Sequence, residues 1–165
     1  MEIISRSISK ISVREKEQEK IIGLCHGCFD IIHHGHIDHF RIAKEQCDTL
    51  FVSVTADEYI NKGPGRPFNP LEFRIKVISA LKYIDFVFES NHPDAIWSIN
   101  QVKPNVYFKG SDYCEGKNFN KNFIIEKEYA QMLGVKTVYT DGKTHSSTYL
   151  YKQIKNDPQI SDHFK

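Results

Sequence analysis

Short apolar runs alternate along the chain with longer segments whose apolar residues recur every three or four positions. The short runs are rich in Ile, Val and Phe, which favours strands buried on both faces of a parallel sheet. Five strands are predicted, at residues 21–26, 50–54, 86–88, 106–108 and 135–140. The periodic segments predict helices at residues 37–46, 69–83 and 93–100, a helix ending near Gly134, and a last helix capped at residues 146–148.

The alternation of strands and helices defines a fold class. Strands separated by helices form a parallel sheet with right-handed crossovers, so the prediction is a Rossmann-like three-layer α/β sandwich with a central five-stranded parallel sheet. The domain is predicted to span residues 21–156, between a polar N-terminal extension (1–20) and a loose C-terminal tail (157–165).

Ligands of such sheets bind beyond the carboxyl ends of the strands, which makes the turns that follow strands the candidate site. The turn at residues 27–36 is the most informative, because His33 and His36 flank Gly35 where a helix is predicted to begin. Free N–H groups and the positive end of the helix dipole favour an anion there. Imidazoles can donate to phosphate oxygens, so the pattern favours a phosphate site over a surface turn with scattered histidines.

Composition narrows the class of ligand. The 165 residues are 40% hydrophobic and 26% charged, with a net charge of +1. Bulk charge therefore gives no reason to expect nucleic-acid binding, and any phosphate site must be local. The apolar runs are far shorter than a membrane span and no signal-peptide pattern opens the chain, so no membrane association and a cytoplasmic location are expected.

Two cysteines, Cys25 and Cys28, form a C-x-x-C pattern that leaves a redox or zinc module open as an alternative. A redox motif normally opens a helix, whereas Cys25 falls inside a predicted strand. A zinc site would need a second pair of ligands, and the nearby histidines do not have a recognisable spacing. Free thiols are therefore the favoured interpretation, and no resident metal site is predicted.

Several motifs together resemble a known family. They are His26-Gly27-Cys28-Phe29-Asp30, His33-x-Gly35-His36, Ala43-Lys44, Arg66-Pro67, Asn69-Pro70-Leu71-Glu72-x-Arg74 and Lys109-Gly110-Ser111-Asp112-Tyr113. With them, the chain from residue 21 to 155 resembles the cytidylyltransferase-like branch of the HxGH nucleotidylyltransferases. The likeness is strongest to heptose 1-phosphate adenylyltransferases, including those joined to a sugar-kinase domain in bacterial proteins associated with surface-carbohydrate biosynthesis. Nothing after Ile154 could be a kinase, so a stand-alone enzyme or a single domain is expected.

The resemblance implies a reaction. A nucleotidyl group passes from a nucleoside triphosphate, which brings Mg²⁺, to a phosphorylated sugar or polyol, with release of pyrophosphate. Glycerol-phosphate cytidylyltransferases carry Arg-Thr-Glu-Gly-Ile-Ser-Thr before their last helix; here residues 140–148 lack the arginine but keep the hydroxyls. CTP and ATP therefore both stay open. The alternatives are a glycerol-3-phosphate-type cytidylyltransferase and a non-catalytic nucleotide sensor; a homodimer, and fusion or association with a sugar kinase, are expected.

The resemblance also implies roles for single residues. The predicted catalytic residues are His33, His36, Lys44 and Lys62. The predicted nucleotide-binding residues are Gly27, Cys28, Phe29, Gly35, Arg66, Lys109, Gly110, Ser146, Ser147 and Thr148. The predicted acceptor-binding residues are Asp30, Arg74 and Asp112.

Some of these roles have structural alternatives. Lys44 lies eight residues after His36 on a similar helix face but could be solvated, while Lys62 and Arg66 could form a mobile clamp on a Gly/Pro loop. Asp30 is favoured to hold its turn through backbone N–H groups. Arg74 could form a surface ion pair, and Asp112 could cap a turn.

Overall fold

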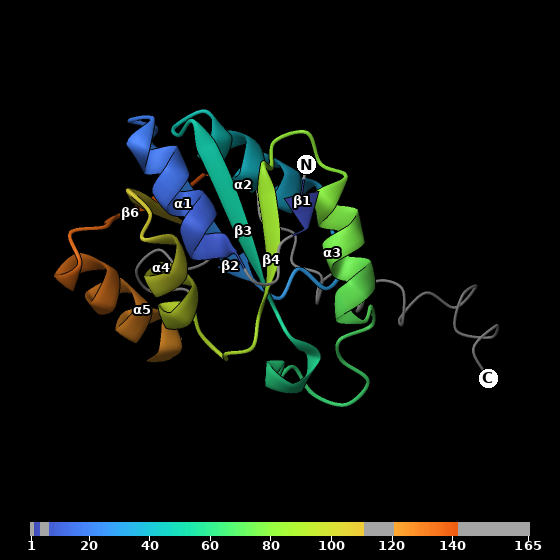
Figure 1. The fold of residues 1–165 in the computed structure, drawn as a ribbon. Coiled ribbons are helices and arrows are strands. Elements are labelled where there is room, and N and C mark those ends of the chain that lie inside the picture. The colour runs from blue at the N-terminus through green and yellow to red at the C-terminus, as the bar shows by residue number, and fades with distance from the viewer. Residues whose placement is uncertain (1, 4–6, 111–120, 142–165) are drawn as a thin grey trace, which may run out of the picture.

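The computed structural model describes residues 2–3, 7–110 and 121–141 of the chain, and a twisted parallel sheet forms its centre (Figure 1). The strands are β1 (Glu2–Ile3), β2 (Ile22–Gly27), β3 (Thr49–Thr55), β4 (Phe86–Ser90), β5 (Val106–Gly110) and β6 (Lys136–Thr140). Their order in the sheet is β1-β4-β3-β2-β5-β6, and every neighbouring pair is parallel. The five predicted strands are confirmed as β2 to β6, and β1 adds a two-residue strand at the edge beside β4.

Helices cover both faces of this sheet, so the predicted three-layer α/β architecture is confirmed. The helices are α1 (Ile8–Glu17), α2 (His34–Lys44), the 3₁₀ turn η1 (Asp57–Tyr59), α3 (Leu71–Ser79), α4 (Ile96–Val102) and α5 (Lys121–Met132). Helices α2 and α3 pack on one face, while α1, α4 and α5 pack on the other (Figure 1). None of the helices in the described ranges is long and apolar enough to cross a membrane.

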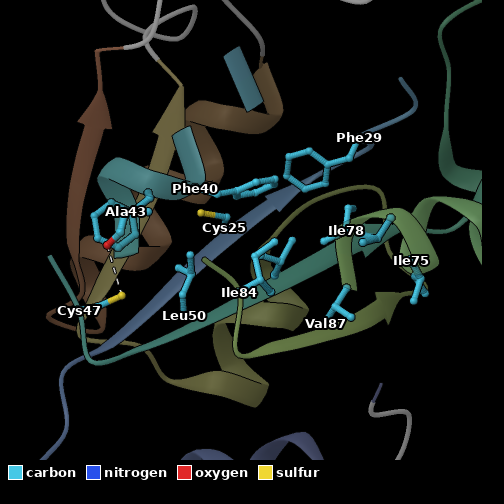
Figure 2. Packing of buried hydrophobic residues seen from close by; sticks show 13 residues of the cluster. Cys25, Phe29, Phe40, Ala43, Cys47, Leu50, Ile75, Ile78, Ile84 and Val87 are labelled. Atoms are coloured by element: carbon cyan, nitrogen blue, oxygen red, sulfur yellow. Dashed lines mark hydrogen bonds between the residues drawn. The ribbon is translucent and has the colours of Figure 1, made fainter. Parts of the chain in front are cut away.

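The two apolar cores follow from the alternation of side chains along each strand. Cys25 points into the core under α2 and α3, whereas the preceding Leu24 points into the core under α1, α4 and α5. Figure 2 shows the first core, where Phe40 and Ala43 of α2 pack over the strands beside Ile78 of α3. Since both faces are covered, apolar residues on β2 to β5 point to both sides of the sheet, and this explains the short hydrophobic runs in the sequence.

The N-terminal segment is more than a polar extension. Helix α1 buries Ile8 and packs against α4, and the hydroxyl of Ser12 donates to the carbonyl of Val102. The carboxylate of Glu15 accepts from the hydroxyl of Thr49 at 2.7 Å and from the ammonium of Lys20 at 2.7 Å. Residues 8–17 therefore pack against the domain. Their polar composition gave no sign of a helix, and the buried polar side chains of this helix form hydrogen bonds within the protein.

Other element boundaries differ modestly from the prediction. Helix α2 begins at His34, three residues earlier than predicted, which places His36 in its first turn. Helix α3 ends at Ser79 instead of near residue 83. The helix expected after residues 146–148 and the tail at 157–165 lie outside the described residues.

The topology identifies the edge where a ligand would bind. From β2 the chain proceeds to β3 and β4 on one side, and then crosses to β5 on the other side of β2. The switch point therefore lies between β2 and β5, at whose carboxyl ends the crevice of a doubly wound sheet is formed. The turn that carries His33 and His36 leaves β2 at this point.

Candidate active site

Two histidine rings stand at the start of α2, directly after β2. His33 is the N-cap residue of the helix, in extended conformation, and its side chain does not cap the helix. The rings of His33 and His36 are stacked, with centroids 3.9 Å apart and planes 27° apart. Both imidazoles therefore face the same place, where the N–H groups and dipole of α2 favour an anion.

The environment of His36 holds the ring in its neutral form. Burial lowers the pKa of His36 to about 3, and the nearby positive charges of His33, His39 and Lys62 act in the same direction. The Nδ1 atom of His36 is buried and makes no hydrogen bond within the part of the chain that the structure describes. An anion placed beside the ring would reverse the balance, because it favours the protonated imidazole.

Phe29 supports His36 from below. The Phe29 ring is buried, with its edge against His36 at a centroid distance of 5.4 Å and against Phe40 at 5.1 Å. Its backbone is in the left-handed region at φ 48°, a conformation that costs a non-glycine residue on the order of 1 kcal/mol. A Cβ on Gly27 would approach the ring to 3.1 Å, so the glycine makes room for it. The predicted contact of the Phe29 side chain with nucleotide is therefore corrected to packing beneath the motif.

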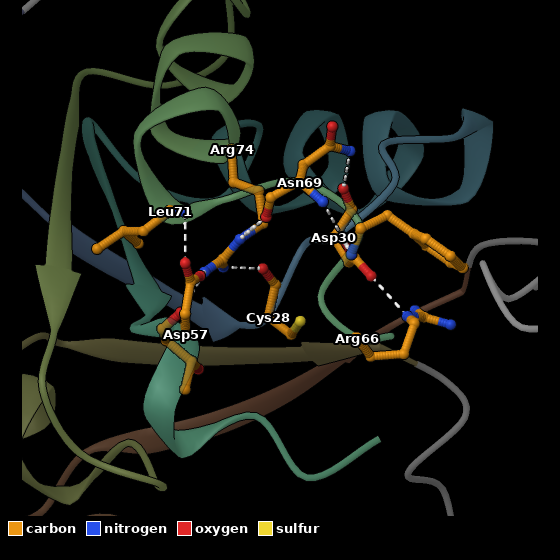
Figure 3. Close-up of polar contacts among 9 residues, drawn as sticks. Cys28, Asp30, Asp57, Arg66, Asn69, Leu71 and Arg74 are labelled. Carbon is orange, nitrogen blue, oxygen red and sulfur yellow. Dashed lines mark hydrogen bonds and ion pairs between the residues drawn. The ribbon is translucent and has the colours of Figure 1, made fainter. Parts of the chain in front are cut away.

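Asp30 anchors the loop that carries Lys62 (Figure 3). Its carboxylate accepts from the backbone N–H groups of Phe68 at 2.8 Å and Asn69 at 3.0 Å, and from Nε of Arg66 at 2.7 Å. Burial would raise the pKa of Asp30, but these hydrogen bonds and the Arg66 charge hold the pKa below its ordinary value. The favoured structural role is thus observed. The side chains of Asp30 and Arg66 are only 0% and 7% exposed, so both are engaged within the protein here, and their predicted contacts with acceptor and nucleotide stay predictions.

Arg74 is enclosed in the protein and does not face a ligand. Its side chain is 0% exposed and forms an ion pair of 2.5 Å with Asp57. It also donates to the carbonyls of Cys28 at 2.6 Å, Thr55 at 2.8 Å and Asn69 at 3.0 Å (Figure 3). Arg74 therefore connects three segments at the carboxyl ends of β2 and β3, and its predicted contact with the acceptor stays a prediction.

Lys62 lies on the exposed part of the same loop. Its positive charge acts on the His36 ring and on the Cys28 thiol, so it lies on the side of the loop that faces the motif. Gly63 and Gly65 adopt φ values of 94° and 73°, which only glycine adopts freely. A cation on a glycine-rich segment beside two imidazoles is suited to a polyphosphate.

Lys44 lies at the other end of α2 from the histidine pair and is engaged there with other groups, so its predicted contact with the phosphates stays a prediction. Its ammonium bonds the carboxylate of Asp85 at 2.6 Å and the carbonyl of Asp48 at 2.5 Å. The same carboxylate accepts from the N–H of Leu50, which places Lys44 at the amino end of β3. Eight residues of helix separate Lys44 from His36 by about 12 Å along the axis, and this rise carries it to the opposite edge of the sheet.

Lys109 is also engaged inside the protein. Its ammonium bonds Glu126 of α5 at 2.7 Å and the hydroxyl of Tyr107 at 2.9 Å, and its side chain is 8% exposed. The predicted contact of this side chain with nucleotide is therefore not supported. Gly110, the last residue of β5, has no atom of the described residues within 4 Å of the position where a Cβ would lie.

The remaining predicted residues divide into two groups. Gly27, Cys28 and Gly35 are half-buried around the motif, where their backbones can approach a ligand. The others lie outside the described residues: Asp112, Ser146, Ser147 and Thr148.

Three contacts near the motif escaped the sequence analysis. His26 is buried between the hydroxyls of Ser53 at 2.8 Å and Thr55 at 3.4 Å, and burial lowers its pKa to about 4. His39, one turn after His36, contacts the hydroxyl of Thr140 at 2.6 Å. The spacing of three residues between His36 and His39 is the signal that could have indicated a shared helix face.

The cysteine environments oppose a redox module. Cys25 is fully buried in β2, and burial raises its pKa well above its ordinary value, the reverse of what a reactive thiol requires. Burial also raises the pKa of Cys28. Cys25, Cys28 and Cys47 are free thiols, and no group of three or more His, Cys, Asp or Glu side chains within the described ranges could hold a metal ion.

A paired-histidine turn at the switch point of a parallel α/β sheet, with a cationic loop beside it, defines the nucleotidylyltransferase class. Residues 24–154 match the family model described as cytidylyltransferase-like, and the chain belongs to this family of nucleotidylyltransferases. The family match includes β2 to β6 and the whole of the site described above.

Curated relatives are longer than this chain. The bifunctional protein HldE of Sulfurimonas denitrificans is 39% identical over 157 residues, covering 93% of this chain and 31% of the relative. The bifunctional protein HldE of Alcanivorax borkumensis is 40% identical over 113 residues, covering 66% of this chain and 23% of the relative. The chain thus spans about a third or less of these relatives.

Solved structures agree with the fold. The lipopolysaccharide core biosynthesis protein of Thermoplasma volcanium superposes with a TM-score of 0.63 at 26% identity, covering 76% of this chain and 99% of that one. The pantoate-β-alanine ligase of Francisella tularensis superposes with a TM-score of 0.64 at 16% identity, covering 99% of this chain and 77% of that one. The second likeness concerns the fold alone.

Proposed function

We propose that the chain transfers a nucleotidyl group from ATP or CTP to the phosphate of a sugar 1-phosphate, releasing pyrophosphate, in the synthesis of activated sugars for surface carbohydrate. The observation that carries this proposal is the stacked pair His33 and His36 at the N-terminus of α2, beside the carboxyl ends of β2 and β5. The similarity to HldE proteins and to a lipopolysaccharide core biosynthesis protein supports a sugar phosphate as the acceptor.

The chemistry matches what these residues can do. A phosphate oxygen of the acceptor attacks the α-phosphorus of the triphosphate in line, a new P–O bond forms, and the bond from the α-phosphorus to the bridging oxygen breaks. The attacking oxygen is already anionic, so the site needs no general base. It needs donors and positive charge around the α- and β-phosphates, where negative charge grows as pyrophosphate leaves.

His33 and His36 supply those donors, and Lys62 supplies the positive charge. Because His36 is neutral in the free protein, its protonated form is favoured only when phosphate oxygens approach. Mg²⁺ enters as part of the nucleotide substrate and offsets the charge of the β- and γ-phosphates. We place the reaction in the cytoplasm, where nucleoside triphosphates are available, and expect a homodimer that functions with a sugar kinase, as the bifunctional relatives suggest.

A substrate matrix tests this proposal. Pyrophosphate release is measured with each of four nucleoside triphosphates and Mg²⁺ against sugar 1-phosphates, glycerol 3-phosphate and other polyol phosphates. The expected result is turnover with ATP or CTP and a sugar 1-phosphate. Turnover with glycerol 3-phosphate alone would show that the acceptor is a polyol phosphate and not a sugar 1-phosphate. Nucleotide binding without turnover for any acceptor would indicate a sensor, and exclusive use of GTP or UTP would contradict the nucleotide assignment.

A further inference from the structure

His39 makes a hydrogen bond that reaches beyond its own helix. It lies on α2 one turn after His36, its side chain is buried, and its Nδ1 is 2.6 Å from Oγ1 of Thr140. Thr140 is the last residue of β6, at the carboxyl edge of the sheet. The contact therefore joins the helix that begins with the histidine pair to the end of a strand more than 100 positions later in the chain.

The direction of this hydrogen bond follows from a third group. The hydroxyl of Thr140 donates to the carbonyl oxygen of Lys109 at 3.3 Å, and a carbonyl can only accept. The hydroxyl arrangement that satisfies both contacts leaves Oγ1 of Thr140 as the acceptor and the proton of His39 on Nδ1, and the tautomer of the ring is what the NMR measurement below decides. Burial lowers the pKa of His39 to about 4, and the charge of Lys109 acts in the same direction, so the ring is neutral at pH 7. In this arrangement the neutral ring has one defined tautomer and one defined partner.

Three segments of the candidate site converge on this contact. Helix α2 begins directly after its N-cap His33 and carries His36 in its first turn, β5 ends with Lys109 and Gly110, and β6 ends at Thr140. Gly110 and Thr140 are register partners in the sheet, so the two strand ends move together. His39 connects that paired edge to the histidine helix.

We propose that His39 is a positioning residue that, through Thr140, sets the placement of the α2 N-terminus relative to the carboxyl ends of β5 and β6. This inference rests on the proposed function, because the placement matters only if the histidine pair and the strand ends act on one substrate complex. His39 does not touch the reacting atoms. Its loss displaces His33 and His36 from the α-phosphate, and small displacements of catalytic groups cost large factors in rate.

Substitutions at both ends of the contact test it. His39→Phe keeps a buried ring but removes the donor, Thr140→Val keeps the shape but removes the hydroxyl, and His39→Asn keeps an N–H donor near the Nδ1 position. We expect His39→Phe and Thr140→Val each to lower kcat about tenfold with less than twofold change in KM for either substrate. His39→Asn should recover most of the rate, and the double variant should be no slower than either single variant, because both act through one contact.

A matched control separates positioning from general destabilisation. Thr49→Val removes another buried threonine hydroxyl, which bonds Glu15 at the amino edge of the sheet. This control should lower the melting temperature without changing kcat. If Thr140→Val and Thr49→Val lower the melting temperature alike and both leave kcat unchanged, or if His39→Asn is as slow as His39→Phe, the positioning role is wrong.

A measurement without turnover distinguishes this inference from the proposed function. In ¹⁵N NMR of the imidazoles at pH 7, His39 should show the Nδ1–H tautomer in the unmodified chain, and Thr140→Val should shift its equilibrium toward Nε2–H. A chain that shows this tautomer but releases no pyrophosphate with any acceptor would overturn the proposed function while leaving the contact established. An Nε2–H tautomer in the unmodified chain would overturn the inference itself.

Discussion

The single side chain on which the account depends most is His36. It is neutral, stacked on His33 and supported by Phe29, so the loss of its imidazole should remove a preorganised donor without disturbing the strands beneath. We expect His36→Ala to lower kcat by about 100-fold, the size of effect seen when one donor to a developing oxyanion is lost. Pyrophosphate release measures the rate, and far-UV circular dichroism should be unchanged. Normal turnover in the double variant His33→Ala, His36→Ala would remove the pair from the mechanism.

Acid should destabilise the fold through its buried histidines. Burial lowers the pKa of His26 and His39 to about 4 and that of His36 to about 3, against 6.5 for the unfolded chain. Between these values the unfolded chain binds more protons than the folded protein. Stability is therefore fully present above about pH 6.5 and is lost as the pH falls toward 4, by up to about 1.4 kcal/mol per pH unit for each histidine.

Urea unfolding at pH 7.0, 6.0 and 5.0 measures this loss. The midpoint should fall steadily with pH, and His39→Phe should reduce the slope because one buried histidine no longer titrates. A midpoint that is constant between pH 7.0 and 5.0 would show that these rings are not buried in neutral form.

At the scale of residues, the histidine motif was predictable from the sequence, whereas the contacts of the charged side chains around it were not. His33, Gly35 and His36 were found because their local spacing carries the chemistry itself. The family resemblance assigned Asp30, Arg66 and Arg74 to ligands, but these side chains bind other segments of the protein across 36 to 46 positions of chain. Local sequence does not reveal which charged side chains form hydrogen bonds and ion pairs with distant segments of the chain.

At the scale of elements, the loop from Ile60 to Asn69 combines a fixed end with an exposed end. Asp30 holds the end with Arg66 and Asn69, while Lys62 and the two glycines are exposed. We expect Lys62→Ala to lower kcat/KM more than tenfold with no change in the urea midpoint, since a solvent-exposed cation contributes little to stability. The control is Lys82→Ala, which removes an exposed lysine just after α3 and should leave kcat/KM nearly unchanged in the same assay. Equal kinetics for the two variants would rule out a role for Lys62.

A substitution at the fixed end of the same loop should lower the stability of the fold, unlike the substitution of Lys62. Asp30→Asn removes the charge of a buried pair and leaves the Arg66 guanidinium without its counter-ion. Breaking a buried ion pair on one side typically costs about 3–5 kcal/mol, so a large fall in unfolding free energy is expected. Denaturant titration measures it, with Lys62→Ala as the reference for the exposed end. A loss below about 1 kcal/mol would show that the pair does not anchor the loop.

Elements were predictable where the pattern was strong and missed where it was weak. Strands β2 to β5 each contain a short apolar run, and the existence of these strands follows from burial on both faces of the sheet. Helix α1 buries only Ile8, Ser12 and Glu15, so its sequence lacks a strong apolar stripe. Lys44 and His36 lie near opposite ends of α2, and Lys44 pairs with Asp85, so the length of the helix separates the two residues.

At the scale of the whole molecule, the sheet order places the functional residues at one edge. All strands are parallel, so their carboxyl ends lie at one edge of the sheet. That edge carries the turn after β2, the Lys62 loop after β3, and the ends of β5 and β6. The architecture was predictable from the alternation of elements. The bond from His39 to Thr140 was not, since it depends on packing between segments 101 positions apart in the sequence.

The central claim, nucleotidyl transfer at the histidine pair, is tested most directly by following the α-phosphorus. The protein is incubated with Mg²⁺, ATP or CTP labelled with ³²P at the α-position, and a sugar 1-phosphate, and the products are separated. The account predicts that the label moves into a nucleoside diphosphate sugar in equal amount to the pyrophosphate released, and that His36→Ala slows this transfer about 100-fold. Label that stays in the triphosphate or appears only in nucleoside monophosphate, or transfer that is unaffected by His36→Ala, would contradict it.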